Sequence, residues 1–245
     1  GNTLASFAGT VTVALGTNLA GGTLSGTTTA AAVAGVATFA DLSIDRAGGG
    51  YTLLVTGAGL STSTAAFTVT PGAAVRLAFA TQPAGATAGA ALTPPLQVAA
   101  QDAFGNTATG FAGNVTLAIG ANPGGATLSG PSTIAAVSGV ATFATLSLNR
   151  SGSGYTLAAS STNLTGATSA AFDVAPGAAA RLSVAIQPSA SAASGGALAQ
   201  QPVVQVQDAN GNAVAQPGLV VGATIASGPN GASLTGAAAT TDGSG

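Results

Sequence analysis

Apolar and polar residues alternate along several short stretches of the chain. Valine, leucine and isoleucine occupy every second position in residues 11–15, 115–119 and 203–206, and Leu53 and Val55 follow Tyr51 in the same way; threonine, alanine or glutamine lies between most of them. Successive side chains of a strand point to opposite faces, so this period of two predicts half-buried strands. No stretch shows a period of 3.6 residues, and glycine, asparagine, proline and serine separate the alternating runs. The pattern predicts an all-β protein.

The alternating runs belong to an internal repeat. Residues 1–3 and 7–12 return almost unchanged at 105–107 and 111–116, an offset of 105 − 1 = 104. The same offset relates residues 35–40 to 139–144 and residues 50–53 to 154–157. Later matches carry small insertions, which are typical of loops: 71–77 returns at 176–182, and 101–106 returns at 207–212.

The repeat length fits a domain of about 100 residues, as in an immunoglobulin-like sandwich, and exceeds the 20 to 50 residues of a solenoid turn. We therefore expect tandem immunoglobulin-like antiparallel β-sandwiches, each with two facing layers. Residues 71–175 would form one complete repeat. Residues 1–70 would hold the later strands of a preceding copy, and residues 176–245 the earlier strands of a following one.

The two tyrosines, Tyr51 and Tyr155, occupy the same position of the repeat, after a glycine-rich turn. This placement resembles the tyrosine corner of sandwich domains, in which the hydroxyl bonds to upstream backbone. A ring that stacks on sugar is the alternative. The corner is the interpretation we prefer.

The composition limits the kinds of ligand and environment that suit the chain. The chain has four arginines and six aspartates but no lysine, glutamate, histidine, cysteine or methionine, and its net charge is -2. This charge offers no basic surface for nucleic acid or anionic lipid. The chain contains no run of about 18 apolar residues, so no membrane-spanning helix is predicted. Disorder is disfavoured because aliphatic residues recur regularly and net charge is low.

The third copy resembles bacterial immunoglobulin-like domains of the invasin and intimin kind. The resemblance lies in Val203-Val204-Gln205-Val206-Gln207-Asp208-Ala209-Asn210-Gly211-Asn212, Gly231-Ala232-Ser233-Leu234-Thr235-Gly236 and Thr240-Thr241-Asp242-Gly243-Ser244-Gly245. Such domains continue with a Gly-Val-Ala-Thr-type strand, which residues 36–39 and 140–143 would supply in the other copies. The resemblance implies a stalk in a surface-attached or secreted bacterial protein.

Catalysis has few candidate residues. A hydrolytic triad needs a base beside its nucleophile, and histidine, lysine, glutamate and cysteine are missing. Asp41 and Asp45 are the carboxylates closest in sequence, as a glycosidase would need, but Thr145 and Asn149 replace them in the next copy. We therefore predict no enzyme activity, no catalytic or cofactor-binding residues, and no cofactor.

The repeated motif Gln-Asp-Ala-x-Gly-Asn contains Asp102 and Asp208. An Asx-type turn, with glycine at positive φ, is the preferred interpretation. Calcium is the alternative, but it needs six to eight oxygen ligands, so we predict no metal site. The arginines also recur as equivalents, Arg46 with Arg150 and Arg76 with Arg181; they are solvated strand ends, partners of a local aspartate, or a weak anion site.

These observations favour a structural repeat segment of a bacterial extracellular or cell-surface protein, serving as stalk or fibre-forming scaffold. An adhesive or carbohydrate-binding module, an adhesin, is the alternative, and Phe104 is its one plausible exposed loop aromatic. Contacts with a cell surface or glycan would then be partners. The incomplete copies also suggest self-association into a head-to-tail filament by strand complementation; a window onto a longer array is the simpler explanation.

Overall fold

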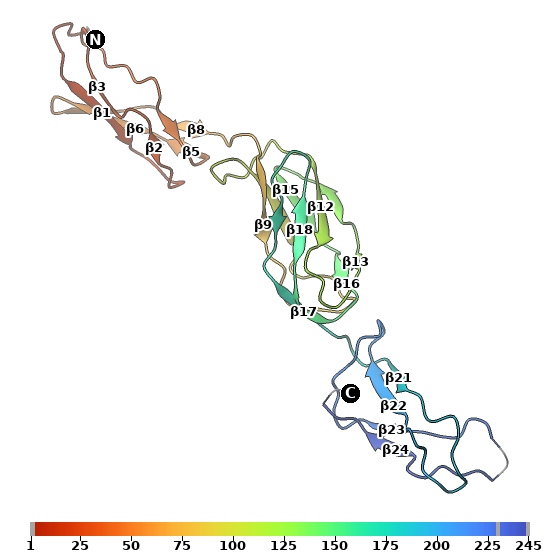
Figure 1. The fold of residues 1–245 in the computed structure, drawn as a ribbon. Coiled ribbons are helices and arrows are strands. Elements are labelled where there is room, and N and C mark those ends of the chain that lie inside the picture. Colours follow the sequence, from red (N-terminus) through yellow and green to blue (C-terminus); the bar gives the residue numbers. More distant parts are fainter. Residues whose placement is uncertain (1–2, 229–230, 244–245) are drawn as a thin grey trace.

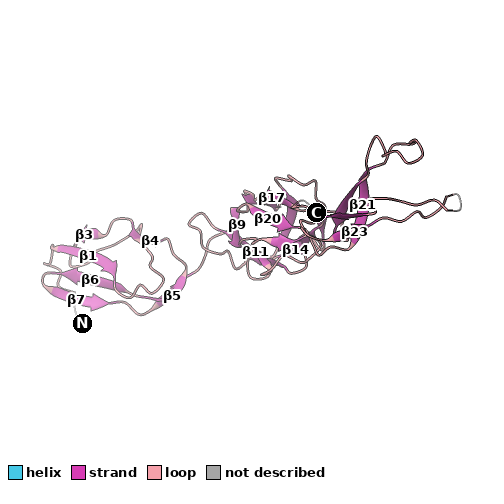
Figure 2. Cartoon of the chain, turned by 90° about the horizontal axis from the view of Figure 1, so that it is seen from below, coloured by secondary structure: helices cyan, strands magenta, loops and turns pink. Residues whose placement is uncertain are grey.

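The protein is built of strands throughout the part of the chain that the structure describes. The computed structural model describes residues 3–228 and 231–243, and in these it contains 24 strands and no helix. The strands form three groups arranged in line along an elongated molecule (Figure 1). Seen from below, the chain remains a row of β-structured bodies joined by short connections (Figure 2).

The first group contains eight strands. They are β1 (Thr10–Leu15), β2 (Leu24–Ser25), β3 (Thr29–Ala31), β4 (Ser43–Ile44), β5 (Gly48–Tyr51), β6 (Leu53–Gly57), β7 (Leu60–Ser63) and β8 (Phe67–Val69). A four-stranded sheet has the order β3-β1-β6-β7, and β2 pairs with β4 and β5 with β8. The pairs are antiparallel.

The second group contains twelve strands. They are β9 (Arg76–Thr81), β10 (Ala86–Thr87), β11 (Leu96–Gln101), β12 (Asn114–Ile119), β13 (Leu128–Ser129), β14 (Thr133–Ala135), β15 (Val140–Phe143), β16 (Ser147–Leu148), β17 (Gly152–Tyr155), β18 (Leu157–Ser160), β19 (Ala167–Thr168) and β20 (Phe172–Ala175). Their sheets have the orders β15-β11-β9, β14-β12-β18-β19, β10-β20-β17 and β13-β16. All these pairs are antiparallel except β10 with β20.

A continuous hydrophobic core fills this second group. Val98 of β11 and Phe143 of β15 come from one sheet, and Val115 of β12 and Leu157 of β18 come from another. All four side chains are at most 1% exposed. The alternating residues of the two sheets therefore meet in a shared interior, as expected for half-buried strands.

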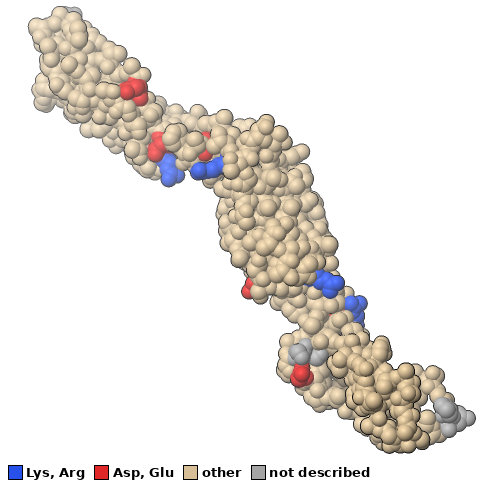
Figure 3. Space-filling model, viewed as in Figure 1, with Lys and Arg blue, Asp and Glu red and all other residues tan. Residues whose placement is uncertain are grey.

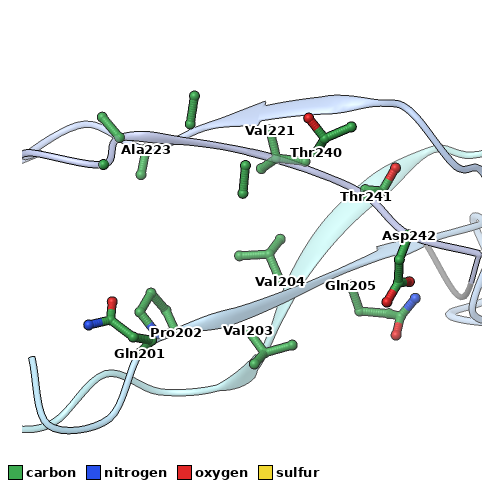
Figure 4. Close-up of a pocket in the computed structure, with 14 residues that line it drawn as sticks. Gln201, Pro202, Val203, Val204, Gln205, Val221, Ala223, Thr240, Thr241 and Asp242 are labelled. Atoms are coloured by element: carbon green, nitrogen blue, oxygen red, sulfur yellow. The ribbon is translucent and has the colours of Figure 1, made fainter.

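The third group is the most open of the three. It consists of β21 (Arg181–Ile186) paired with β22 (Val203–Gln207), and β23 (Val220–Gly222) paired with β24 (Ala238–Thr240). An apolar groove of about 470 Å³ lies between the two strand pairs, with Val203, Val204 and Val221 among its lining residues (Figure 4).

Strand positions follow the repeat found in the sequence. Strand β12 begins 114 − 10 = 104 residues after β1, and β21 begins 181 − 76 = 105 residues after β9. The register is also repeated, since Thr10 lies opposite Ala31 in the first copy and Asn114 opposite Ala135 in the second. All described strand pairings join residues within 10–69, within 76–175 or within 181–240. The predicted spacing of strands is confirmed.

One predicted strand is wrong. Residues 140–143 form β15, but the equivalent residues 36–39 form no strand, and Val36 makes only an isolated bridge to Val33. The reason is the missing partner: β15 pairs with β11 alone, and no segment of residues 3–70 pairs with 36–39 in that way. A strand needs a neighbour to bond its backbone, so the same sequence stays irregular here.

Candidate functional site at the repeat junctions

The Gln-Asp-Ala-x-Gly-Asn loop is built around a buried aspartate in both copies. Asp208 is 1% exposed. Its Oδ1 accepts the backbone N–H groups of Asn210 and Asn212, both at 2.9 Å. Its Oδ2 accepts the Gly177 N–H at 2.8 Å and the Asn212 side-chain amide at 2.7 Å. The predicted Asx-type turn is confirmed, and Gly211 has the expected positive φ of 81°.

Asp102 repeats this arrangement one copy earlier. Its oxygens accept N–H groups of Phe104 at 3.0 Å, Asn106 at 2.9 Å and Gly72 at 2.9 Å, and the Asn106 side-chain amide at 2.9 Å. The loop thus ties the strand that precedes it to the linker that enters the same repeat. Gly105 again has a positive φ, 86°.

These hydrogen bonds hold both aspartates in their charged form. Burial by itself raises the pKa of Asp208, but bonds from the Asn212 side chain and from the N–H groups of Gly177, Asn212 and Asn210 outweigh it and lower the pKa from 3.8 to about 2. For Asp102, burial also acts upward, and bonds from Asn106, Gly72 and Phe104 lower the pKa to about 2. Hydrogen bonds to a carboxylate favour ionisation.

The asparagine that ends each loop reaches across to the preceding repeat. Asn106 donates from Nδ2 to the Asp45 carbonyl at 2.8 Å, and its Oδ1 accepts the Ala47 N–H at 3.0 Å. Asn212 does the same with the Asn149 carbonyl and the Ser151 N–H, both at 3.0 Å. We call this two-bond contact the asparagine clamp. It occurs at both junctions with equivalent partners.

The clamp uses the whole amide group. One Nδ2 hydrogen of Asn212 goes to Asp208 and the other to Asn149, while Oδ1 takes the Ser151 N–H. Each neutral hydrogen bond contributes about 1 kcal/mol, and bonds to the charged aspartate contribute more. The buried aspartate therefore orients the asparagine, and the asparagine fixes the neighbouring repeat.

The tyrosines hold the other side of each junction. Tyr155 is fully buried and donates from its hydroxyl to the Arg150 carbonyl at 2.9 Å. Tyr51 donates to the Arg46 carbonyl at 2.9 Å. These bonds confirm the predicted bond from each hydroxyl to upstream backbone. They also set the 45–47 and 149–151 turns that the clamps grip.

The second junction has one further contact. Asn210 donates from Nδ2 to the Ala88 carbonyl at 3.3 Å, which again joins two repeats. Its equivalent at the first junction is Phe104, whose side chain is 66% exposed. The two junctions therefore share the clamp and differ at this loop position.

The remaining predicted candidates are separated. Asp41 accepts the backbone N–H and hydroxyl of Thr27, both at 2.9 Å, whereas Asp45 accepts the Thr23 N–H at 2.6 Å. Bonds from the Thr27 backbone and side chain lower the pKa of Asp41. Each carboxylate thus bonds a different residue of the 23–27 segment, and the two do not share a site. Among the described residues, no group of three or more Asp, Glu, His or Cys side chains is placed to hold a metal ion.

The arginines lie at the ends of the repeats, where the space-filling view shows blue groups at both junctions (Figure 3). Arg76 donates from Nε to Gln101 and Arg181 to Gln207, each at 3.2 Å. The aspartates, arginines and tyrosines could be predicted from the sequence, but the clamp could not. Its one signal was the recurrence of Asn106 and Asn212 at the end of the shared motif.

Comparison with known proteins gives distant structural likenesses. No protein-family model and no curated protein matches the chain. Two similar solved structures are of the surface layer protein SbsC: its domains 4–9, with 18% identity and a TM-score of 0.32 over 100% of this chain, and its domains 1–6, with 17% identity and a TM-score of 0.31 over 88%. A beta-glycosidase from Bacteroides vulgatus has 12% identity and a TM-score of 0.38 over 67% of this chain.

The chain spans only 36%, 27% and 21% of the lengths of these three proteins, in the order given. Within the described residues, no helix is long and apolar enough to cross a membrane.

Proposed function

We propose that the chain is a structural segment of an extracellular or cell-surface protein, in which tandem immunoglobulin-like sandwiches act as a stalk or fibre-forming scaffold. The proposed units are residues 1–70, 71–175 and 176–245, of the bacterial immunoglobulin-like kind that the sequence resembles. The observation that carries the proposal is the asparagine clamp, which joins successive units through equivalent bonds at both junctions. A stalk needs defined angles between its units, and repeated direct bonds supply them.

The absence of a chemical site in the sequence supports the same proposal. The four arginines and six aspartates include no repeated catalytic pair, and both repeated aspartates are used by loop backbone. We therefore propose that the segment has no enzyme activity and needs no cofactor. Nucleic acid is not a proposed partner, because four arginines give too few phosphate contacts.

The proposal is tested by removing both clamps. In small-angle scattering of the 245-residue chain, the double variant Asn106→Ala with Asn212→Ala should show a smaller maximum dimension and a broader distance distribution. Asn122→Ala is the matched control, because Asn122 bonds the Ala126 N–H and carbonyl inside one repeat, at 2.7 and 2.9 Å. Identical scattering from the double variant and the native chain would show that the clamp does not set the junction angle.

An adhesive or carbohydrate-binding module is a second candidate function, and exposed Phe104 favours it. An aromatic ring in a loop at 66% exposure offers a stacking surface. The test is a glycan array probed with the full chain and with Phe104→Ala. Specific binding that the variant loses would support the adhesive function, and an empty array would leave the scaffold as the better proposal.

The open third group supports self-association, which we propose as a further property of the scaffold. Leu182, Val184 and Ile186 of β21 are 51%, 49% and 41% exposed, and the groove of Figure 4 lies beside the neighbouring strands. Strands of a second copy arranged head to tail would cover these side chains. Sedimentation velocity tests this property: concentration-dependent growth supports strand complementation, and a constant monomer contradicts it.

A further inference from the structure

Two arginines from successive repeats meet at the second junction. A Cβ atom built on Gly211 would lie 2.5 Å from Nη2 of Arg181 and 3.8 Å from Nη1 of Arg150. Both guanidinium groups therefore face the same point of the Gly211 backbone, although 31 positions of chain separate the two residues. Glycine permits this approach because it carries no side chain.

The surrounding structure holds the Arg181 side chain and the backbone on either side of Arg150. Gln207 accepts a hydrogen bond from Nε of Arg181 at 3.2 Å. Arg150 lies between Asn149 and Ser151, the two residues held by the asparagine clamp. The pair is thus assembled by the junction itself, one arginine from each repeat.

No carboxylate forms an ion pair with either guanidinium among the residues that the structure describes. The nearest acidic group of this loop, Asp208, is buried and accepts four hydrogen bonds from Gly177, Asn210 and Asn212. Both arginines are exposed to solvent. On the face shown in Figure 3, no red group lies beside the blue pair at the lower junction.

Two guanidinium groups held together repel each other, and an anion between them removes the repulsion. Planar guanidinium groups match the oxygens of phosphate and sulfate in bidentate geometry. We propose that Arg150 and Arg181 form a binding site for a tetrahedral oxyanion, a phosphate or sulfate group, free or carried on a polymer. The site exists only when the junction is formed.

The first junction provides a natural control. There Asp45 stands at the position of Asn149, next to Arg46, and Arg76 is the one group within 4 Å of a Cβ built on Gly105. Asp45 and Asn149 make the same hydrogen bond, to the N–H of Thr23 and Thr127 respectively. The first junction thus carries one more negative charge, and Arg46 does not join Arg76 at the glycine, so the anion should avoid it.

The experiment is a titration of the ¹⁵N-labelled 245-residue chain with inorganic phosphate, sulfate and dimethyl phosphate, at constant ionic strength set by chloride. We expect saturable amide shifts at Ser151 and Gly211, and none at Ala47 and Gly105. Arg150→Gln and Arg181→Gln should each abolish the shifts, with thermal melting unchanged. Binding of dimethyl phosphate would indicate a polymer-borne diester, and binding of the inorganic ions alone would indicate a free anion.

Adding a negative charge at position 149 is the more specific test of the site. Asn149→Asp keeps the bond to Thr127 but adds a negative charge, so it should abolish saturation at Ser151. Shifts that grow linearly with every anion, survive Arg181→Gln, or ignore the Asn149→Asp exchange would overturn the proposal.

Discussion

At the scale of single residues, two of the six aspartates have a structural role in the loops at the junctions. Asp102 and Asp208 each accept four hydrogen bonds, two of them from the asparagine that contacts the preceding repeat. A neutral acceptor would bond these donors less strongly. The carboxylate is therefore a structural centre for the loop and the junction at once.

The replacement Asp208→Asn should lower the free energy of unfolding of the third repeat. Asparagine has one acceptor oxygen and would place its NH₂ group against N–H donors, which leaves buried groups unpaired at a cost of about 2 to 4 kcal/mol. Asp173→Asn is the control, because that exposed carboxylate accepts one N–H, from Gly154 at 2.9 Å. Urea titration followed by far-ultraviolet circular dichroism measures the free energy of unfolding of both variants. Equal losses in the two variants would contradict the role of Asp208.

Acid should destabilise the fold in a defined window. Both aspartates have a folded pKa of about 2, below the ordinary 3.8, so the unfolded chain binds protons first as the pH falls. Their stabilisation is complete above pH 4 and is lost between pH 4 and pH 2. Melting temperature measured from pH 2 to 9 should fall in that window. It should stay nearly flat from pH 5 to 9, because the chain has no histidine, cysteine, lysine or glutamate.

The structural role of a residue could be predicted from the sequence only where the residue recurs at an equivalent position of the repeat. Tyr155 and Asp208 recur at fixed offsets, and their local hydrogen bonds follow from known turn and corner geometry. The bonds of Asn212 join residues 61 and 63 positions apart across a junction. Sequence spacing gives no geometry for such a contact, so the clamp required the structure.

At the scale of elements, equivalent strands differ in what covers them. Leu77 of β9 is 4% exposed inside the closed core, whereas its repeat equivalent Leu182 of β21 is 51% exposed. Apolar residues alternate in both strands, at Leu77 and Phe79 and at Leu182 and Val184, so the alternation alone does not decide burial. Burial of a strand depends on the strands that cover it. Strand formation also depends on a partner, which residues 36–39 lack and residues 140–143 have in β11.

This difference predicts unequal effects of equivalent truncations. Leu77→Ala removes buried methyl groups and leaves a cavity, and it should cost about 2 to 5 kcal/mol. Leu182→Ala removes an exposed side chain and should change stability by less than about 0.5 kcal/mol. Chemical denaturation of the two variants measures both values. A large loss at Leu182 would show that its face is covered in solution.

At the scale of the whole molecule, the chain is a row of bodies joined by local bonds. Strand pairing stays within the three groups, and the described junction contacts include the two asparagine clamps and the Asn210 bond. Where each unit of a repeat protein contacts only its neighbours, stability is approximately the sum of the units and of the contacts between them. The three groups should therefore differ in stability, because one core is closed and the others are open.

Hydrogen exchange should report this order directly. The backbone amides of β11, β12 and β18 lie around the closed core, where Val98, Val115 and Leu157 are fully buried, so they should open only with the second group as a whole. Strands β21 to β24 have exposed side chains and few partner strands, so their amides should exchange faster by orders of magnitude. Exchange read by mass spectrometry of peptides covers all three groups. Equal protection of β21 and β11 at high protein concentration, together with loss of that protection on dilution, would mean that a second copy closes the open face.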